Sequence, residues 1–172
     1  MKKIYLNGIT ANERYTLVDD EDYEYLNQFK WSMTKKGYVQ GYIGKKTTKF
    51  GNVRNMQMHR VIMFDKLKSG VFVDHINGNK LDNRKCNLRL CNLTENNRNR
   101  GKIHFKQSQS VVSKYKGVWW DRTKWRTAIT VNNKKIYLGR FYNEDEAAKA
   151  YNEASKKYFG EFSYLNNIGG EY

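Results

Sequence analysis

The C-terminal third of the chain carries the pattern that most constrains its fold. Three β-prone segments follow one another there, and the last two alternate between apolar and polar residues: G-V-W-W from residue 117, K-W-R-T-A-I-T-V from 124 and K-K-I-Y-L-G-R-F from 134. A period of two is typical of strands with one buried face. Asn132-Asn133 lies between the last two segments and suits a hairpin turn, because asparagine tolerates positive φ. The pattern predicts a three-stranded antiparallel sheet.

A helix is predicted to follow this sheet. Asn143 and Glu146 have the spacing of a capping box, and Gly160 is a natural stop. Small and aromatic side chains recur at helical spacing between them and would pack on the sheet: Ala147, Ala150, Tyr151, Ala154 and Tyr158.

Alternation along the strands divides their side chains between two faces. The face toward the helix would hold Val118, Ile129, Val131, Ile136 and Leu138, with Trp125 in the core. The other face would expose Trp119, Arg126, Thr130, Lys135 and Tyr137. A basic and aromatic sheet of this size can enter the DNA major groove, where arginine reads guanine edges and lysine binds phosphate. Burial of these aromatics against the N-terminal region is the alternative.

The charge balance indicates a polyanionic partner. The chain has 32 Lys and Arg against 17 Asp and Glu, a formal net charge of +15. Charge alone fits a ribosomal or generic nucleic-acid-binding protein as well as an enzyme. The 39% hydrophobic content favours small modules with modest cores. Because no long apolar segment or signal-peptide pattern occurs, we expect an intracellular protein without a membrane partner.

Residues 71 to 100 carry groups that suit a hydrolytic site. Asp74 and His75 end the apolar run of Val71, Phe72 and Val73, so packing would hold their backbones rigid. Asn87 precedes a short alternating strand. Asn92 and Glu95 have capping-box spacing, so a helix should begin at Asn92 and carry Asn96 on its first turns.

These groups are the ones that phosphodiester hydrolysis requires. Asp74 and Asn96 would hold a hard cation, Mg²⁺ or Mn²⁺, while His75 would deprotonate the attacking water. The Asn87 amide would orient His75, with Asn83 as a rival for this role. Nearby arginines would clamp phosphates, although each alone is more often a solvated surface residue: Arg60, Arg89, Arg98 and Arg100.

No structural zinc is expected. The two cysteines, Cys86 and Cys91, do not form the closely spaced pairs that structural zinc sites use. The alternative is a zinc site that borrows one of the histidines: His59, His75 or His104.

The first 55 residues say little about function. Short β-prone runs at 3 to 6 and 37 to 44 predict strands, and the acidic residues at 19 to 22 predict the start of a helix. A basic run either contacts phosphates or forms a solvated surface: Lys45, Lys46, Lys49 and Arg54.

The central residues resemble an HNH endonuclease with the ββα-metal fold, of the zinc-free homing type carried by phages. Asp74-His75, Asn87 and Asn96 fall on its motif, which spans about residues 56 to 100. The resemblance implies that Asp74 and Asn96 hold the metal, His75 is the general base and Asn87 orients it. Asn96 stands where many relatives have histidine, which favours oxygen ligation.

The C-terminal residues resemble the plant ethylene-response-factor, or APETALA-type, DNA-binding domain. Y-K-G-V-W-W, K-W-R, Y-L-G-R-F, E-A-A-K-A-Y and a closing L-N carry this resemblance from Tyr115 to about Asn166. Trp119 stands where plant proteins often have arginine, and the chain is one residue shorter before Trp125, so plant target sequences do not transfer. By position, the resemblance implies contacts to DNA from Lys116, Trp119, Arg122, Lys135, Tyr137 and Arg140, with Tyr151 near a phosphate.

The sequence therefore predicts an α+β protein with a nuclease core between two other modules. The expected boundaries are 1–55 for a β-rich region, 56–100 for the nuclease, 101–113 for a linker, 114–166 for the DNA-binding domain and 167–172 for a tail. The expected activity is metal-dependent hydrolysis of double-stranded DNA by a monomer or weak dimer in a phage or bacterial host cell. A DNA-binding regulator with a vestigial centre and an RNA-binding protein are the rival interpretations.

Overall fold

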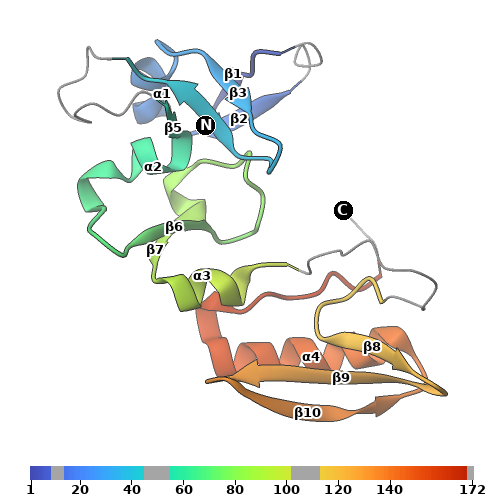
Figure 1. Ribbon diagram of the computed structural model, residues 1–172. Coiled ribbons are helices and arrows are strands. Elements are labelled where there is room, and N and C mark those ends of the chain that lie inside the picture. The colour runs from blue at the N-terminus through green and yellow to red at the C-terminus, as the bar shows by residue number, and fades with distance from the viewer. Residues whose placement is uncertain (9–13, 45–54, 102–112, 170–172) are drawn as a thin grey trace. The chain divides into compact units, whose positions relative to one another are not determined.

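The chain forms two compact units, Met1–Asn96 and Asn97–Tyr172. The computed structural model describes residues 1–8, 14–44, 55–101 and 113–169, and in both units helices accompany antiparallel strands (Figure 1). The predicted α+β class is confirmed. Several predictions concern residues outside the described ranges: the basic run Lys45, Lys46, Lys49 and Arg54, the alternative ligand His104, most of the linker and the end of the tail.

The described residues of the first unit form three small antiparallel sheets and short helices. The strands pair as β1 with β2, as β3–β4–β5, and as β6 with β7. Its elements are β1 Lys2–Tyr5, β2 Tyr15–Val18, α1 Asp20–Leu26, β3 Trp31–Met33, β4 Val39–Tyr42, β5 Asn55–Gln57, α2 Met58–Ile62, the 3₁₀ turns Phe64–Lys66 and Lys85–Asn87, β6 Phe72–His75, β7 Leu88–Cys91 and the start of α3 Leu93–Asn99.

A single hydrophobic core joins the N-terminal region to the predicted nuclease module. Met58 and Val61 of α2 pack in one cluster with residues of the first sheets: Ile4, Leu6, Val18, Leu26, Trp31, Val39 and Ile43. Strand β5 also pairs with β4 across the predicted boundary after residue 55. Because apolar burial and strand pairing both cross that boundary, it does not separate two packing units.

The β6–β7 hairpin presents the predicted site residues, and β2 holds part of the long loop between its strands. The Leu17 amide donates to the Leu81 carbonyl at 2.8 Å, and the Asn83 amide donates to the Leu17 carbonyl at 2.8 Å. Strand β2 therefore binds the loop segment from Leu81 to Asn83 through its backbone.

From residue 113 to residue 169, the second unit has the predicted three strands and one helix. Its elements are β8 Val118–Asp121, β9 Lys124–Val131, β10 Lys134–Phe141, α4 Glu144–Phe159 and the 3₁₀ turn Gly160–Phe162. Figure 1 shows α4 lying along one face of the sheet, and apolar side chains from both elements fill the space between them. Asn132 and Asn133 have φ of 49° and 63°, which confirms the predicted hairpin turn.

The ends of α4 follow the prediction only in part. The Asn143 side chain accepts from the Asp145 amide at 2.7 Å, and the helix ends at Gly160 with φ of 54°. Glu146 is exposed and does not complete a capping box. Tyr158 is exposed, whereas Phe159 is buried against the sheet. Helix α4 thus turns a slightly different face to the sheet than the sequence pattern predicts. No helix among the described residues is both long and apolar enough to cross a membrane.

Candidate active site

His75 occupies a buried position at the end of β6. His75 is only 3% exposed, and its backbone pairs with that of Leu88 in β7. Burial lowers the pKa of the His75 imidazole below its ordinary value of 6.5, so the ring is neutral at neutral pH. A neutral imidazole is the form that can accept a proton.

Asn83 makes the orienting contact to His75. The His75 Nε2 atom lies 3.2 Å from the Asn83 Oδ1 atom, and Asn83 is 1% exposed. The amide of Asn87 is used differently: its Oδ1 accepts from the Asn77 backbone amide at 3.0 Å and its Nδ2 donates to the Asp82 carbonyl at 2.8 Å. Asn87 therefore ties together the two ends of the loop, and its predicted role as the amide that orients His75 falls to the rival Asn83.

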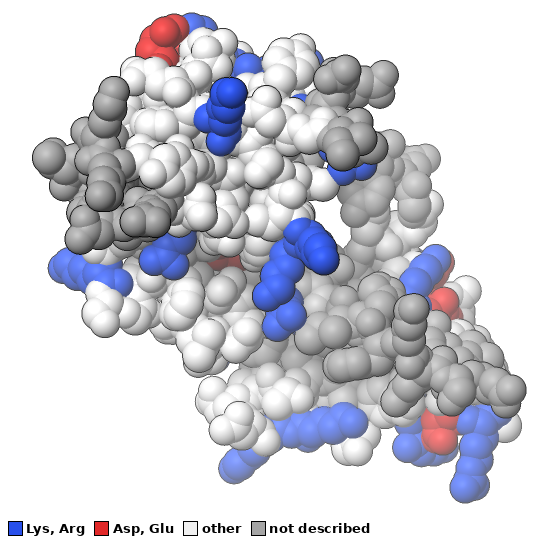
Figure 2. Space-filling view, turned by 45° about the horizontal axis from the view of Figure 1, so that its top comes forward, with Lys and Arg blue, Asp and Glu red and all other residues white. Residues whose placement is uncertain are grey.

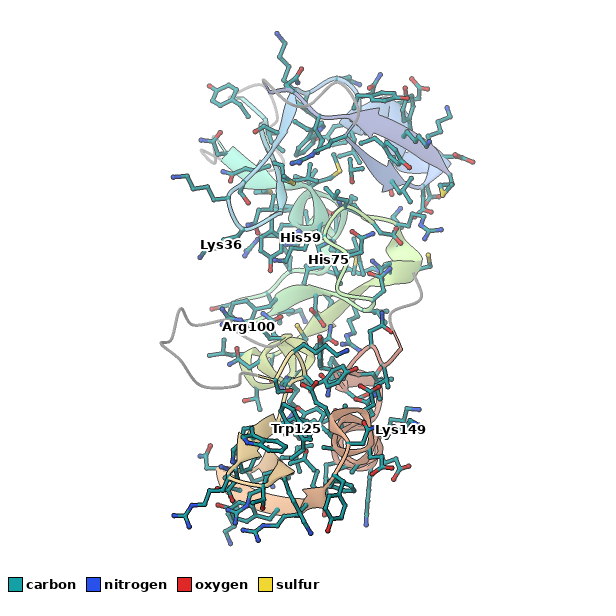
Figure 3. All side chains as sticks on the ribbon, turned by 90° about the vertical axis from the view of Figure 1, so that its right-hand side faces the viewer. Lys36, His59, His75, Arg100, Trp125 and Lys149 are labelled. Carbon is teal, nitrogen blue, oxygen red and sulfur yellow. The ribbon has the colours of Figure 1, made fainter. Side chains whose placement is uncertain are left out.

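Two aromatic side chains that the sequence did not assign to the site pack near His75. The ring centroid of His59 lies 5.0 Å from that of His75, with the planes at 77°. The Tyr38 ring lies 5.4 Å from His59 and 6.2 Å from His75. Figure 3 shows His59 and His75 pointing toward one another from α2 and β6. The M-H-R segment at the start of α2 was the available signal for His59.

His59 is uncharged in this position. Burial lowers its pKa from 6.5 to about 3, with the nearby His75 and Arg60 acting in the same direction. A neutral ring beside His75 adds packing without adding a positive charge. The cluster of His75, His59 and Tyr38 thus limits the movement of the His75 ring on one side.

Asp74 pairs with Arg89 across the hairpin. The two residues are partners in the register of β6 and β7, and Arg89 donates two hydrogen bonds to Asp74 Oδ2, from Nη2 at 2.8 Å and from Nε at 3.2 Å. Both side chains are nearly buried. Arg89 therefore neutralises the predicted metal ligand, and its predicted role as a phosphate clamp is not the one seen in this structure.

The capping box that starts α3 is confirmed. The Asn92 amide donates to Glu95 Oε2 at 2.8 Å, and the Glu95 amide donates to Asn92 Oδ1 at 2.9 Å. Asn96 is the fourth residue of α3, and its side-chain amide has no hydrogen bond to any residue that the structure describes. One residue, Asn92, separates the end of β7 from the start of α3. Asn96 therefore lies close in sequence to the strand that pairs with β6, which carries Asp74.

The chemistry of Asp74 and Asn96 fits a hard divalent cation. A carboxylate and an amide supply oxygen ligands, and Mg²⁺ commonly takes one or two such groups and keeps several waters. Across the described ranges, no three His, Cys, Asp or Glu side chains gather into a possible metal site. A cation at Asp74 and Asn96 would therefore have few protein ligands and would share its coordination with water and phosphate.

The remaining predicted arginines differ in their environments. Arg60 on α2 is exposed, and so is Arg100. The Arg98 guanidinium lies 4.9 Å from the centre of the Phe159 ring, within the second unit. Arg60 and Arg100 therefore present a charge to solvent, whereas Arg98 also covers an aromatic ring.

Trp119, Lys135 and Tyr137 lie together on the outer face of the C-terminal sheet, as predicted. Trp119 and Tyr137 approach edge to face at 6.4 Å, and Tyr137 is 65% exposed. The Lys135 Nζ atom lies 4.5 Å from the Trp119 ring centre and 5.3 Å from that of Tyr137. This group forms an exposed surface with one positive charge, as nucleic-acid-binding sheets have.

Asp121 is a part of this face that the prediction missed. Its Oδ2 atom lies 2.6 Å from Arg126 Nε and 3.3 Å from Arg140 Nη2. One carboxylate therefore offsets part of the charge of two predicted DNA-binding residues. Figure 2 shows the same tendency, since the basic side chains on the visible surface are scattered and some lie beside acidic ones.

Lys116 and Tyr151 do not lie where the resemblance places them. Lys116 Nζ donates to the Arg98 and Arg100 carbonyls at 2.8 and 2.6 Å, and burial lowers its pKa to about 8. Tyr151 is 3% exposed and packs beneath the sheet. Both are structural residues in this unit. Arg122, by contrast, is exposed in the turn between β8 and β9 with φ of 56°.

The segment that carries these residues matches a known protein family. Residues 57–98 match the family model described as HNH endonuclease. The chain is also 28% identical over 159 residues to "Uncharacterized HNH endonuclease L560" of Acanthamoeba polyphaga mimivirus, which covers 90% of this chain and 75% of the relative.

The C-terminal unit matches a second group of proteins. It is 38% identical over 55 residues to the AP2-like ethylene-responsive transcription factor At1g16060 of Arabidopsis thaliana, covering 32% of this chain and 16% of that protein. It is 42% identical over 40 residues to the ethylene-responsive transcription factor-like protein At4g13040 of the same plant, covering 23% of this chain and 18% of that protein. The chain thus spans less than a fifth of these plant relatives. No solved structure matches.

Proposed function

From the premise that this chain carries an HNH endonuclease domain at residues 57–98, joined to an AP2-like domain, we propose that it is a metal-dependent DNA endonuclease. Its AP2-like domain positions the nuclease on double-stranded DNA. We further propose a homing-type enzyme that acts in the cytoplasm of a phage or bacterial host.

One observation carries the proposal. His75 is a buried, neutral imidazole held by Asn83, and the adjacent residue is the carboxylate Asp74 at the end of the same strand. A fixed proton acceptor beside a hard oxygen ligand is the pairing that hydrolysis of a phosphodiester needs. Both residues lie within the segment that matches the HNH model.

The side chains then have distinct roles in the reaction. His75 accepts a proton from a water molecule as the water oxygen attacks phosphorus and the bond from phosphorus to the 3′ oxygen breaks. Asp74 and Asn96 would hold a divalent cation, most suitably Mg²⁺ or Mn²⁺. When bound, that cation would stabilise negative charge on the phosphate and the departing oxygen. Arg60 and Arg100 are both exposed, and we propose that they contact flanking phosphates.

The division between the two domains separates chemistry from recognition. The nuclease site would act on backbone groups that all DNA shares, whereas Trp119, Lys135 and Tyr137 would contact the duplex elsewhere. One active site cuts one strand, so a monomer would nick DNA, and a double-strand cut would require a second copy or repositioning.

Conversion of supercoiled plasmid to nicked or linear DNA tests the proposal. The plasmid would carry a library of candidate phage targets, and cleavage would be followed with Mg²⁺, with Mn²⁺ and with EDTA. The wild type should cleave only with a divalent metal, and His75→Ala should lose activity by about 100-fold or more. Lys68→Ala, a change at an exposed position in the segment before β6, is the control and should cleave like the wild type.

Binding of that DNA without cleavage in either metal would overturn the proposal in favour of a DNA-binding regulator. Preference for single-stranded RNA over duplex DNA at matched salt would favour the RNA-binding interpretation.

A further inference from the structure

We propose that Thr16 is a positioning residue for the nuclease site: acting through Asn83, it holds the proton of the His75 ring on Nε2 and leaves Nδ1 as the nitrogen that accepts a proton. The assignment of the tautomer depends only on the geometry. Its consequence for catalysis rests on the proposed function. Thr16 belongs to β2 and lies outside the residues that match the HNH model.

Two side-chain hydrogen bonds connect Thr16 to His75 through Asn83, and a third anchors the Thr16 hydroxyl to the backbone. The Thr16 hydroxyl donates to the Leu81 carbonyl at 2.8 Å. The same oxygen accepts from Asn83 Nδ2 at 2.8 Å, and Asn83 Oδ1 faces His75 Nε2 at 3.2 Å. The second hydrogen of Asn83 Nδ2 is directed to the Lys80 carbonyl at 3.2 Å.

The direction of each hydrogen bond follows from what the atoms can do. The Leu81 and Lys80 carbonyls can only accept, so the Thr16 hydroxyl and the Asn83 NH₂ group must donate to them. The Asn83 oxygen is therefore the atom turned toward His75. Because an amide oxygen also only accepts, the His75 Nε2 atom must carry the ring proton, which makes Nδ1 the unprotonated nitrogen.

The opposite orientation of the Asn83 amide would be unfavourable. Rotation of the amide by half a turn would place its oxygen toward the Lys80 carbonyl, so that two acceptors would face each other. Thr16 is 0% exposed and Asn83 is 1% exposed, so water does not compensate for a mismatched pair. The tautomer of His75 is therefore set by groups that are themselves fixed.

The hydroxyl of Thr16 is not needed to attach the loop to β2. The backbone bonds of Leu17 to Leu81 and Asn83 already do so. Valine has nearly the same shape as threonine and would fill the same buried space, but it has no oxygen to accept from Asn83. The specific contribution of Thr16 is thus a buried acceptor that selects the orientation of the Asn83 amide together with the Lys80 carbonyl.

The nitrogen chemical shifts of His75 test the proposal directly. Full-length protein with ¹⁵N-labelled histidine would be studied by long-range ¹H–¹⁵N correlation at neutral pH, with His75→Gln used to assign the signals. In the wild type, the pattern should be that of a ring protonated on Nε2. A ring protonated on Nδ1 would overturn the proposal whatever any variant does, and whether or not the protein cleaves DNA.

Two substitutions at Thr16 separate positioning from folding. Thr16→Ser keeps the hydroxyl and should retain the wild-type tautomer. Thr16→Val leaves only the Lys80 carbonyl to hold the Asn83 amide, so a measurable fraction of His75 should shift to the other tautomer. In plasmid cleavage, Thr16→Val should lower kcat by about 10-fold or more with KM for DNA unchanged, and Thr16→Ser should stay near wild type. A Thr16→Val protein with an unchanged tautomer would refute the role of Thr16. Failure of the wild type to cleave would refute only the proposed function, because the tautomer measurement does not depend on it.

Discussion

Asp74 and Arg89 stand directly opposite each other on β6 and β7, and their side chains form an ion pair with an N–O distance of 2.8 Å. Arg89 is 10% exposed and Asp74 is 12% exposed, so the pair is largely removed from water. The carboxylate proposed to hold a metal is thus compensated by a basic residue of the adjacent strand. This arrangement allows the hairpin to fold before any cation binds.

Replacing Arg89 by methionine should destabilise the first unit and make it respond to metal. The substitution leaves the Asp74 charge nearly buried without this partner, which typically costs about 3 kcal/mol in the free energy of unfolding. Millimolar Mg²⁺ should then raise the melting temperature of Arg89→Met more than that of the wild type, because the cation replaces the lost positive charge. Thermal unfolding followed by circular dichroism measures both effects.

The double substitution Asp74→Asn with Arg89→Met is the control for this effect. It removes both charges, so it should be more stable than Arg89→Met alone and should not respond to Mg²⁺. An Arg89→Met protein as stable as the wild type would contradict the importance of the pair.

Stability should fall in mild acid because of His59. Its pKa in the folded protein is about 3, against an ordinary value of 6.5. The unfolded chain therefore binds a proton at this residue over a pH range in which the folded chain does not. The contribution is complete above about pH 6.5 and is lost as the pH falls toward 3, with a slope of about 1.4 kcal/mol per pH unit for one proton. Urea unfolding at a series of pH values between 4 and 7 measures this slope.

His59→Phe is the matched variant, since phenylalanine keeps a ring beside His75 but does not titrate. Its free energy of unfolding should depend less steeply on pH than that of the wild type. The two slopes should differ by up to about 1.4 kcal/mol per pH unit, which corresponds to one proton. Equal slopes in the two proteins would show that another group causes the acid sensitivity.

Lys116 and Lys135 should have opposite effects although both are basic residues of the C-terminal unit. Lys116 binds two backbone carbonyls, so Lys116→Met should lower the stability of this unit by about 1–3 kcal/mol with little effect on the salt dependence of DNA binding. Lys135 is exposed, so Lys135→Met should leave stability nearly unchanged. It should weaken the dependence of the DNA-binding constant on salt concentration by the amount expected for the loss of about one phosphate contact. Fluorescence anisotropy with labelled duplex DNA at several salt concentrations distinguishes them. A weaker salt dependence of DNA binding for Lys116→Met would show that Lys116 contacts DNA phosphate after all.

Gly117 should tolerate no side chain, whereas Gly160 should tolerate one at modest cost. Gly117 has φ of +76°, and a Cβ atom there would lie 2.2 Å from the Tyr151 ring and 2.8 Å from the Ala128 carbonyl. Gly160 also has positive φ, at +54°, but a Cβ there would meet nothing within 4 Å. Gly117→Ala should cost about 3 kcal/mol or more, from backbone strain and overpacking together, and Gly160→Ala about 1 kcal/mol from strain alone. Chemical denaturation measures the free energy of unfolding of both variants. Equal losses would contradict a close contact between Gly117 and the Tyr151 ring.

Features that depend on neighbours in sequence were predictable. The Asn92–Glu95 capping box, the Asn132-Asn133 turn and the strands of the C-terminal sheet all follow from spacing within a few residues. The cap at Asn143 and the stop at Gly160 of the helix after the sheet were predicted, although the capping-box bond from Glu146 is not formed. Its buried face was less certain, because Tyr158 and Phe159 are adjacent and only packing against the sheet selects Phe159.

The identity of the chemical groups in the site was also readable from sequence, but their partners were not. Asp74 and His75 were found as a candidate pair, since they end an apolar run. Their contacts come from Arg89 and Asn83, which were expected to clamp phosphate or to compete with Asn87. The sequence does not reveal which of several arginines, or which of several asparagines, satisfies a buried group. All arginines have the same hydrogen-bonding capacity, and so do all asparagines.

By itself, then, the sequence determined the α+β class, the order of strands and helix in the C-terminal unit, and the presence of a carboxylate, an imidazole and amides suited to a nuclease. Only the tertiary structure decided which of these groups meet. Asn83 and Thr16 are 67 residues apart, Lys116 and Asn166 are 50 apart, and Asp121 and Arg140 are 19 apart. Local spacing is set by covalent geometry, whereas burial, charge compensation and the orientation of a buried amide depend on chain segments that only folding brings together.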